Sequence, residues 1–228
     1  NAQARRSFGQ ALALDPTFSR AHAGLSFTHF QNAFQQWEDR DSEVRRALDS
    51  AGQALAMDDR DPAAHWAMGR ALWLAGDAPA SLEELQSAVS LSPNFAQGHY
   101  SLAFVHSQSG DPQMAVNAAD QSRRLSPYDP MMFAMLGARA MALVRLGRLD
   151  EAAEYATKAA NRPNVHAHVL GIAAHCLAMA GRMDEARQMV GVIRRQLPGY
   201  RSGNFFAAFK FADDAAGAFG EAARKLGW

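Results

Sequence analysis

The sequence predicts an all-α fold, a right-handed solenoid of antiparallel helix pairs, and two observations carry that prediction. Residues 147–152 read Gly-Arg-Leu-Asp-Glu-Ala and return 34 residues later, at 181–186, as Gly-Arg-Met-Asp-Glu-Ala. A glycine and a polar residue, followed by acids and a small apolar residue, are typical of a tight joint between two helices. Weaker copies of this joint begin at Gly76 and Gly110, again 34 residues apart. The period therefore indicates an array of helix–turn–helix units.

The chain begins with the second helix of a pair, which ends at Pro16 because proline cannot continue the hydrogen-bond ladder of a helix. The first full pair begins near Ser19. It exceeds the repeat length by about nine residues, and we expect the excess to extend the helices around residues 31–41. Since no methionine starts the chain and Asn1-Ala2 resembles an expression scar, we expect a fragment of a longer protein.

Two regular pairs follow, and the fourth pair is expected to have a first helix, opened by residues 128–130, about three residues longer than usual. The last full pair is predicted over about residues 165–197. Gly69 and Gly137 lie in first helices, where the two helices of a pair must approach closely. We expect a larger side chain at either position to force the pair apart.

A capping segment is expected after the last pair, because an array would otherwise expose the apolar face of its final repeat. One short helix there is predicted to hold four phenylalanines: Phe205, Phe206, Phe209 and Phe211. Residues 215–226 are predicted to form another helix. The sequence thus predicts a leading half repeat with five helix pairs over residues 1–199, and C-terminal capping helices over residues 200–228.

The charge balance and cysteine content exclude several classes of protein. The 228 residues include 23 basic and 23 acidic side chains, so the net charge is zero. This argues against binding of nucleic acid or an anionic membrane by bulk electrostatics. No apolar run reaches the roughly 18 residues that a membrane-spanning helix needs. The single cysteine, Cys176, fits a reducing compartment, so we expect a cytoplasmic protein.

No pattern of catalytic or metal-binding residues emerges. The sequence lacks a glycine-rich phosphate loop, a His-Glu-x-x-His motif and a Cys-x-x-Cys motif. His65 and His99 are 34 residues apart and His22 takes the same place in its own repeat. Equivalent places in neighbouring repeats lie about 10 Å apart, too far to share one zinc ion. We therefore expect structural histidines, no catalytic residue, no cofactor and no metal.

The first helix of each pair lines the concave face of such a solenoid, and large aromatic side chains gather on those helices. Exposed aromatic surface usually marks a binding site, although each ring could instead pack between neighbouring helices. We predict that Trp73 is an exposed anchor, so that Trp73→Ala weakens partner binding and leaves helicity and melting nearly intact. If Trp73 belonged to the core instead, the same substitution would make melting collapse. The predicted partner-binding residues are Arg20, Phe27, Phe30, Trp66, Arg70, Trp73, Tyr100 and Phe104.

Several motifs carry a family resemblance. Residues 11–16 (Ala-Leu-Ala-Leu-Asp-Pro), residues 91–94 (Leu-Ser-Pro-Asn) and the two Gly-Arg joints resemble tetratricopeptide repeats. More narrowly, residues 20–25 (Arg-Ala-His-Ala-Gly-Leu) and 222–227 (Ala-Ala-Arg-Lys-Leu-Gly) resemble the C-terminal repeat arrays of one bacterial group. That group comprises class III adenylate or guanylate cyclases and winged-helix transcriptional regulators. The resemblance implies an interaction or regulatory module whose parent carries its activity upstream.

The sequence therefore predicts a non-catalytic protein–protein interaction module, the regulatory part of a larger bacterial signalling or transcription protein. Its partner would be a protein or peptide segment, including the upstream domain of the same chain. The alternative is a sensor that holds a small molecule in the same groove. A homo-oligomer is left open.

Overall fold

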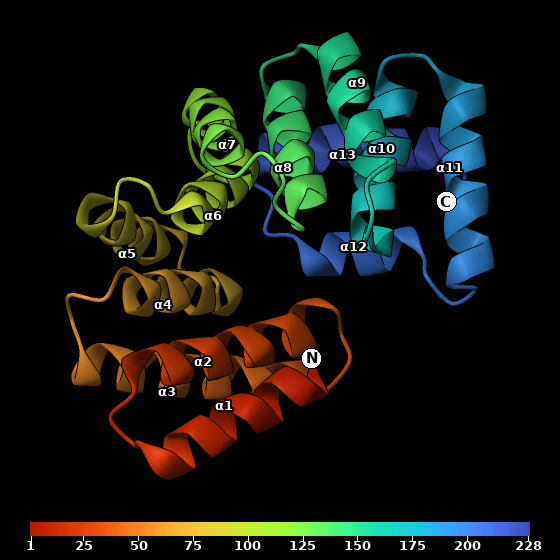
Figure 1. Ribbon diagram of the computed structural model, residues 1–228. Helices are drawn as coiled ribbons and strands as arrows, with labels where there is room; N and C mark the ends of the chain where they lie inside the picture. Colours follow the sequence, from red (N-terminus) through yellow and green to blue (C-terminus); the bar gives the residue numbers. More distant parts are fainter. The chain divides into compact units, whose positions relative to one another are not determined.

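The computed structural model describes residues 1–228 as thirteen α-helices without a strand. The helices form two compact units, Asn1–Leu102 and Ala103–Trp228 (Figure 1). One leading helix, five antiparallel pairs and two terminal helices follow each other along the chain, which confirms the all-α repeat architecture. The boundary between array and cap at residue 199 stays a prediction.

The first unit contains the leading helix and the long repeat. Helix α2 has 16 residues and α3 has 18, against 14 in α4, so the excess does extend both helices of the pair. The helices of this unit are α1 (Ala2–Leu14), α2 (Ser19–Phe34), α3 (Arg40–Met57), α4 (Pro62–Ala75), α5 (Ala78–Leu91) and the first part of α6 (Ala96–Gln108).

The second unit contains the end of α6 and seven further helices. Helix α8 has 14 residues, the same number as α7, so the prediction of a longer first helix is wrong. The reason is that residues 127–131 form the turn before α8 and are not part of it. The bounds are α7 (Pro112–Leu125), α8 (Met132–Arg145), α9 (Leu149–Ala160), α10 (Ala167–Met179), α11 (Met183–Gln196), α12 (Ser202–Ala208) and α13 (Asp213–Leu226).

Three of the four glycine joints share one backbone geometry. Gly76, Gly147 and Gly181 have φ values of 100°, 71° and 77°, a left-handed conformation that favours glycine. The N–H after each glycine donates to a carbonyl five residues earlier at 2.9–3.0 Å, as in a Schellman motif. Gly110 differs, because its φ is not positive. A Cβ at that position would instead collide with the ring of His106.

The core is thin and rich in alanine, as small side chains let helices approach closely. In the first unit, seven buried alanines of α2, α3 and α4 form one cluster: Ala23, Ala47, Ala51, Ala54, Ala64, Ala67 and Ala71. Two serines of α2 also bond to α3: the hydroxyl of Ser19 donates to the carbonyl of Ala54 at 3.0 Å, and that of Ser26 to the carbonyl of Ala47 at 2.8 Å.

Gly69 marks the closest approach within the α4–α5 pair. A Cβ there would lie 2.6 Å from Cγ of Leu85 and 3.0 Å from the carbonyl oxygen of Ser81. At Gly137, the nearest atom is Cδ1 of Ile172 at 3.4 Å, an ordinary contact with α10 and not with the paired helix α9. The expected close approach is thus confirmed at Gly69 and is wrong at Gly137.

We expect Gly69→Leu to lower the free energy of unfolding by about 1–3 kcal/mol, because the new side chain overlaps Leu85 and the backbone at Ser81. Gly52→Leu is the matched control. It also lies inside a helix, but the nearest atom to its added Cβ is the flexible Met68 Cε at 3.9 Å. Urea denaturation measures the free energy of unfolding of both variants. Equal values would mean that α4 and α5 have room to separate.

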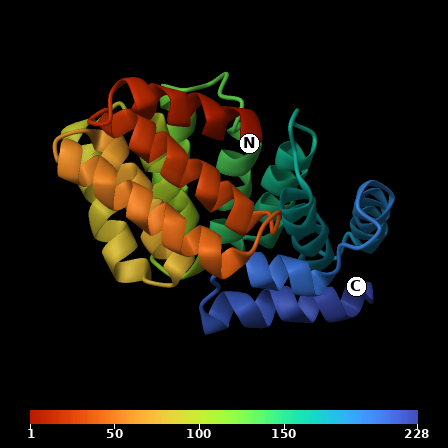
Figure 2. The same ribbon diagram turned by 90° about the horizontal axis from the view of Figure 1, so that it is seen from below.

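The terminal segment packs on the last helices of the second unit. Helices α12 and α13 are drawn in blue at the bottom of Figure 2, and both contact α10. The ring centroids of Phe205 in α12 and Phe219 in α13 are 5.7 Å apart. Both rings are fully buried. Phe209 and Phe211 lie beyond the end of α12, so the prediction of one helix with four phenylalanines is wrong. The second predicted helix, 215–226, is confirmed as α13.

Candidate partner-binding site

Three predicted site residues of the first unit pack around the guanidinium of Arg70. Its Cζ atom lies 4.0 Å from the ring centroid of Phe30, 5.4 Å from that of Phe27 and 5.6 Å from that of Tyr100. Its Nη1 donates to the hydroxyl of Ser101 at 3.2 Å. Arg70 is only 5% exposed, and this burial lowers its pKa, against the opposing influence of Tyr100. Arg70 of α4 therefore joins α2 and α6 through cation–π contacts, and it is not exposed on a binding surface.

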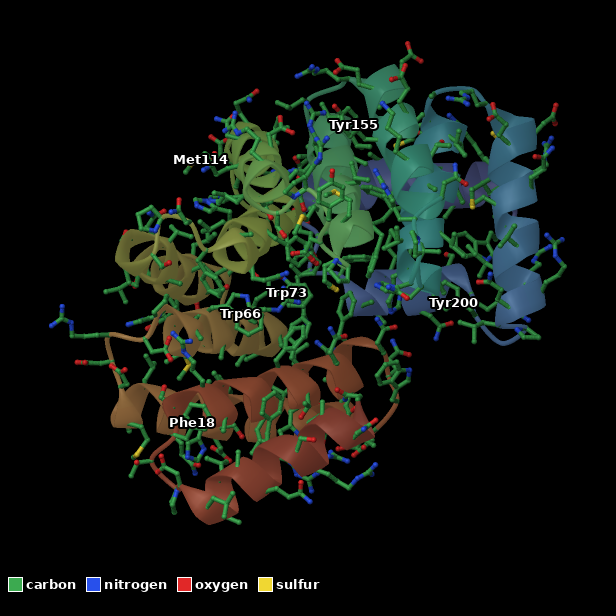
Figure 3. The ribbon with its side chains drawn as sticks, viewed as in Figure 1. Phe18, Trp66, Trp73, Met114, Tyr155 and Tyr200 are labelled. Atoms are coloured by element: carbon green, nitrogen blue, oxygen red, sulfur yellow. The ribbon has the colours of Figure 1, made fainter.

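Trp73 belongs to the core. Its side chain is 1% exposed, and its ring centroid lies 6.0 Å from that of Phe30 and 6.1 Å from that of Phe34 (Figure 3). Phe30 and Tyr100 are also buried. The expectation that these rings are exposed is wrong, because Phe30 of α2 and Trp73 of α4 pack on one another and Tyr100 of α6 packs against Arg70.

Phe27 and Trp66 keep part of their surface exposed. Their ring centroids are 4.9 Å apart, and Trp66 also meets the ring of Phe95 at 6.2 Å. The indole Nε1 of Trp66 donates to the hydroxyl of Ser101 at 2.9 Å, which fixes the ring. A rigid, half-exposed aromatic edge therefore remains on α2 and α4.

Arg20 lies at the start of α2, with 69% of its side chain exposed. Its Nε donates to Oδ2 of Asp61 at 3.0 Å, while Oδ1 of the same carboxylate caps α4 through the N–H of Ala63. Asp61 is almost fully buried and is fixed by the helix that it caps. This pairing holds Arg20 by one nitrogen and leaves its two Nη atoms for a ligand.

A cavity of about 460 Å³ lies beside Arg20, between the turn before α2 and the turn before α4. Phe18 and Met57 at its edge are 45% and 44% exposed (Figure 3 labels Phe18). Sequence reasoning missed this cavity. The signal that could have found it is a large apolar residue at the edge of each turn, Phe18 just before α2 and Met57 at the end of α3. Its lining consists of Asp15, Thr17, Phe18, Ser19, Arg20, Met57, Asp58, Arg60, Asp61 and Pro62.

Phe104, the last predicted site residue, belongs to the second unit. It is 5% exposed, and its ring centroid lies 6.2 Å from that of Phe209 in the terminal segment. The prediction of an exposed ring is therefore wrong for Phe104 as well.

Comparison with known proteins decides the family. Residues 38–96 and 100–166, more than half of the chain, match the tetratricopeptide repeat family. The chain belongs to this family. Tetratricopeptide repeats mediate protein–protein interactions, and the match indicates no enzyme family. No curated protein sequence matches the chain.

Solved structures agree with this fold. PilF of Pseudomonas aeruginosa is similar with a TM-score of 0.60 and 21% identity, over 90% of this chain and 87% of that chain. Cut9–Hcn1 of the APC/C gives a TM-score of 0.73 and 18% identity, over 92% of this chain and 40% of that chain. YrrB gives a TM-score of 0.51 and 18% identity, over 90% of this chain and 97% of that chain. At these identities the likeness shows the fold alone.

The repeat period explains why three histidines, one in each of three successive repeats, make the same contact. The Nε2 atom of each lies 2.8–3.0 Å from the carbonyl oxygen of the residue six positions earlier, in the turn between two repeats. The histidines are His22, His65 and His99, and their partners are Pro16, Asp59 and Pro93. Burial lowers the pKa of His65, but hydrogen bonds to Glu84 and Asp59 outweigh it and raise that pKa above its usual value. These histidines hold the turns, as expected.

His175 of α10 is a buried, uncharged histidine. It is 0% exposed and stacks on Phe205 with ring centroids 4.5 Å apart, while Nδ1 donates to the carbonyl of Gly171. Burial lowers its pKa to about 4, because the aromatic surroundings disfavour the imidazolium ion. Burial likewise raises the pKa of the neighbouring Cys176 thiol. Both side chains are therefore part of the core under α12.

No helix of the structure has both the length and the apolar character to cross a membrane. The histidine, cysteine and acidic side chains form no group of three or more that could hold a metal ion.

Proposed function

We propose that this tetratricopeptide array is a non-catalytic module that binds an extended segment of a partner protein on its first unit. The observation that carries the proposal is the geometry of Arg20. Its side chain is 69% exposed beside a cavity of about 460 Å³, and a buried carboxylate holds it in place. A guanidinium fixed by one nitrogen can still bind a carboxylate or a backbone carbonyl with the other two.

The aromatic edge supplies the apolar half of the site. Phe27 follows Arg20 by seven residues, about two helical turns, so the two side chains lie on one face of α2. Trp66 packs against Phe27 from the next first helix. Half-exposed rings of this kind are frequent anchors at protein interfaces. The buried members of the predicted set, such as Arg70 and Trp73, would support this face from beneath.

The peptide-binding description of YrrB supports the same class of ligand. That protein is described as a TPR protein with an unusual peptide-binding site. We extend a peptide ligand to this chain by analogy, and we place the array in a larger cytoplasmic, bacterial signalling or transcription-regulatory protein. The partner segment would come from another protein or from an upstream domain of the parent.

Selection from a random peptide library on the full chain tests the proposal. We expect selected peptides to bind Arg20→Ala roughly tenfold or more weakly, since a charge-assisted hydrogen bond contributes about 1.5–3 kcal/mol. Arg45→Ala is the matched control, because Arg45 is also exposed but lies on α3, away from the cavity lining. Isothermal titration calorimetry measures both affinities.

Peptides that bind both variants equally would place the site elsewhere. A selection without binders, combined with small molecules whose affinity depends on Arg20, would favour the ligand-sensor alternative.

A further inference from the structure

The segment between α12 and α13 lies along the end of α6 in an extended conformation. Phe209 has φ −103° and ψ 156°, and Ala212 has φ −68° and ψ 163°. The backbone N–H of Lys210 donates to the side-chain Oε1 of Gln108 at 2.8 Å. The backbone N–H of Ala212 donates to the main-chain oxygen of the same residue at 2.9 Å. One glutamine therefore holds two backbone amides of the segment.

Gln108 is arranged for this contact by its own helix. Its side chain is 0% exposed, and its Nε2 donates to the carbonyl of Phe104 at 2.8 Å. This bond turns the amide so that Oε1 faces the segment. The acceptor thus binds a backbone N–H that any extended peptide can supply, which is how peptide-binding surfaces gain affinity without a sequence requirement.

Alternate side chains of the segment supply specificity. The ring of Phe209 lies 6.2 Å from Phe104 and 6.0 Å from His168 between ring centroids. Side chains two residues apart in an extended chain point to the same side. Phe211 accordingly packs against the same aromatic cluster, 4.8 Å from Phe219. The segment is therefore recognised as an aromatic–X–aromatic pattern.

Arg145 binds the acidic residue that follows the segment, Asp214. Nε of Arg145 donates to Oδ2 of Asp214 at 2.9 Å, while its Nη1 donates to the carbonyls of His106 and Gly110 at 2.9 and 2.7 Å. The guanidinium is thus fixed by the end of α6 and by the following turn. Burial raises the pKa of Asp214, but the bond and charge of Arg145, together with backbone hydrogen bonds at the start of α13, lower that pKa overall.

We propose that this face of α6 is a second peptide-binding site, occupied in the free protein by residues 209–214 of the same chain. Its partner is a segment with two aromatic residues separated by one residue in an extended stretch, and with an acid three positions after the second aromatic residue, where α13 begins in this chain. The partner binds by displacing the internal segment. An internal competitor acts at an effective concentration of up to roughly millimolar, so it sets a threshold for the partner. The proposal does not depend on the Arg20 site.

The probe for the test is a fluorescein-labelled peptide of residues 207–214, titrated against full-length chains by anisotropy. Ala212→Pro removes one backbone donor of the internal segment without strain, since a φ of −68° suits proline. We expect this variant to bind the peptide about 2- to 10-fold more tightly than the parent chain, the change that one hydrogen bond produces. Ala212→Ser keeps the N–H and should bind like the parent, and Arg20→Ala should too.

Displacement is measured in the parent chain itself, which covers the case in which Ala212→Pro does not fold. With a ¹⁵N-labelled chain and excess unlabelled peptide, amide exchange of Lys210 and Ala212 should accelerate. A peptide with alanine in place of both phenylalanines should have no effect. The proposal is overturned if the peptide binds neither chain, if parent and Ala212→Pro bind it equally, or if exchange at the two amides stays unchanged.

Discussion

Trp73→Ala is expected to destabilise the protein by about 3–5 kcal/mol, the usual cost of removing a large aromatic side chain from a core. Trp73 is 1% exposed between Phe30 and Phe34, so its loss leaves a cavity that α2 and α4 cannot close without moving. The melting temperature should fall clearly. This expectation replaces the prediction of an exposed anchor.

Trp37→Ala is the matched control for this experiment, because Trp37 is 60% exposed in the turn before α3. Its loss should change stability little and should remove the tryptophan emission that acrylamide quenches most easily. If Trp73→Ala melted like the parent while Trp37→Ala did not, the assignment of Trp73 to the core would be wrong.

Deletion of residues 203–228 is expected to cause aggregation. The segment covers α10 closely: a Cβ on Gly171 would lie 2.9 Å from Cδ2 of Phe205, and His175 is buried beneath the same ring. Removing it exposes the apolar face of α10 and leaves the final repeat uncapped.

Deletion of residues 1–14 is the control for this truncation, because helix α1 contains no buried residue. The shorter chain should stay monomeric in size-exclusion chromatography with light scattering, while the chain without residues 203–228 should form large particles. A soluble monomer after the C-terminal deletion would show that the terminal segment is a separate arm and not a cap.

The repeat architecture could be predicted because its signals are local. A glycine with positive φ and an acid in the first helical turn mark a joint wherever they occur, as at Gly147 and Gly181. The equivalent histidines could be placed for the same reason, since a fixed period puts them in the same turn of each repeat. The different geometry at Gly110 could not be predicted, because the sequence does not show that the ring of His106 fills the space where a Cβ would lie.

The exposure of the aromatic face could not be predicted from periodicity. A helical period shows that Phe30, Trp73 and Tyr100 lie on one side of their helices, but it does not show what covers that side. Arg70 illustrates the difficulty. From the sequence an arginine is expected to be exposed to solvent, but Arg70 is surrounded by aromatic rings and is 5% exposed.

The cavity beside Arg20 and the extended segment after α12 were missed for other reasons. The cavity joins two turns that are about 40 residues apart in the sequence, and a repeat period does not predict contacts between turns. A short apolar run such as residues 205–211 does not by its period distinguish helix from extended chain. The backbone angles of Phe209 and Ala212, and the bonds from Lys210 and Ala212 to Gln108, reveal the extended part.

The most direct test of the central claim is a ¹⁵N spectrum of the full chain with a peptide selected on it. The Nε–H of Arg20 and the indole N–H of Trp66 are the side-chain reporters next to the proposed surface. We predict that both signals shift on binding, together with backbone amides of the turns at residues 15–18 and 57–62. Shifts confined to other helices, with the Arg20 and Trp66 signals unchanged, would contradict the proposal that the first unit binds the partner here.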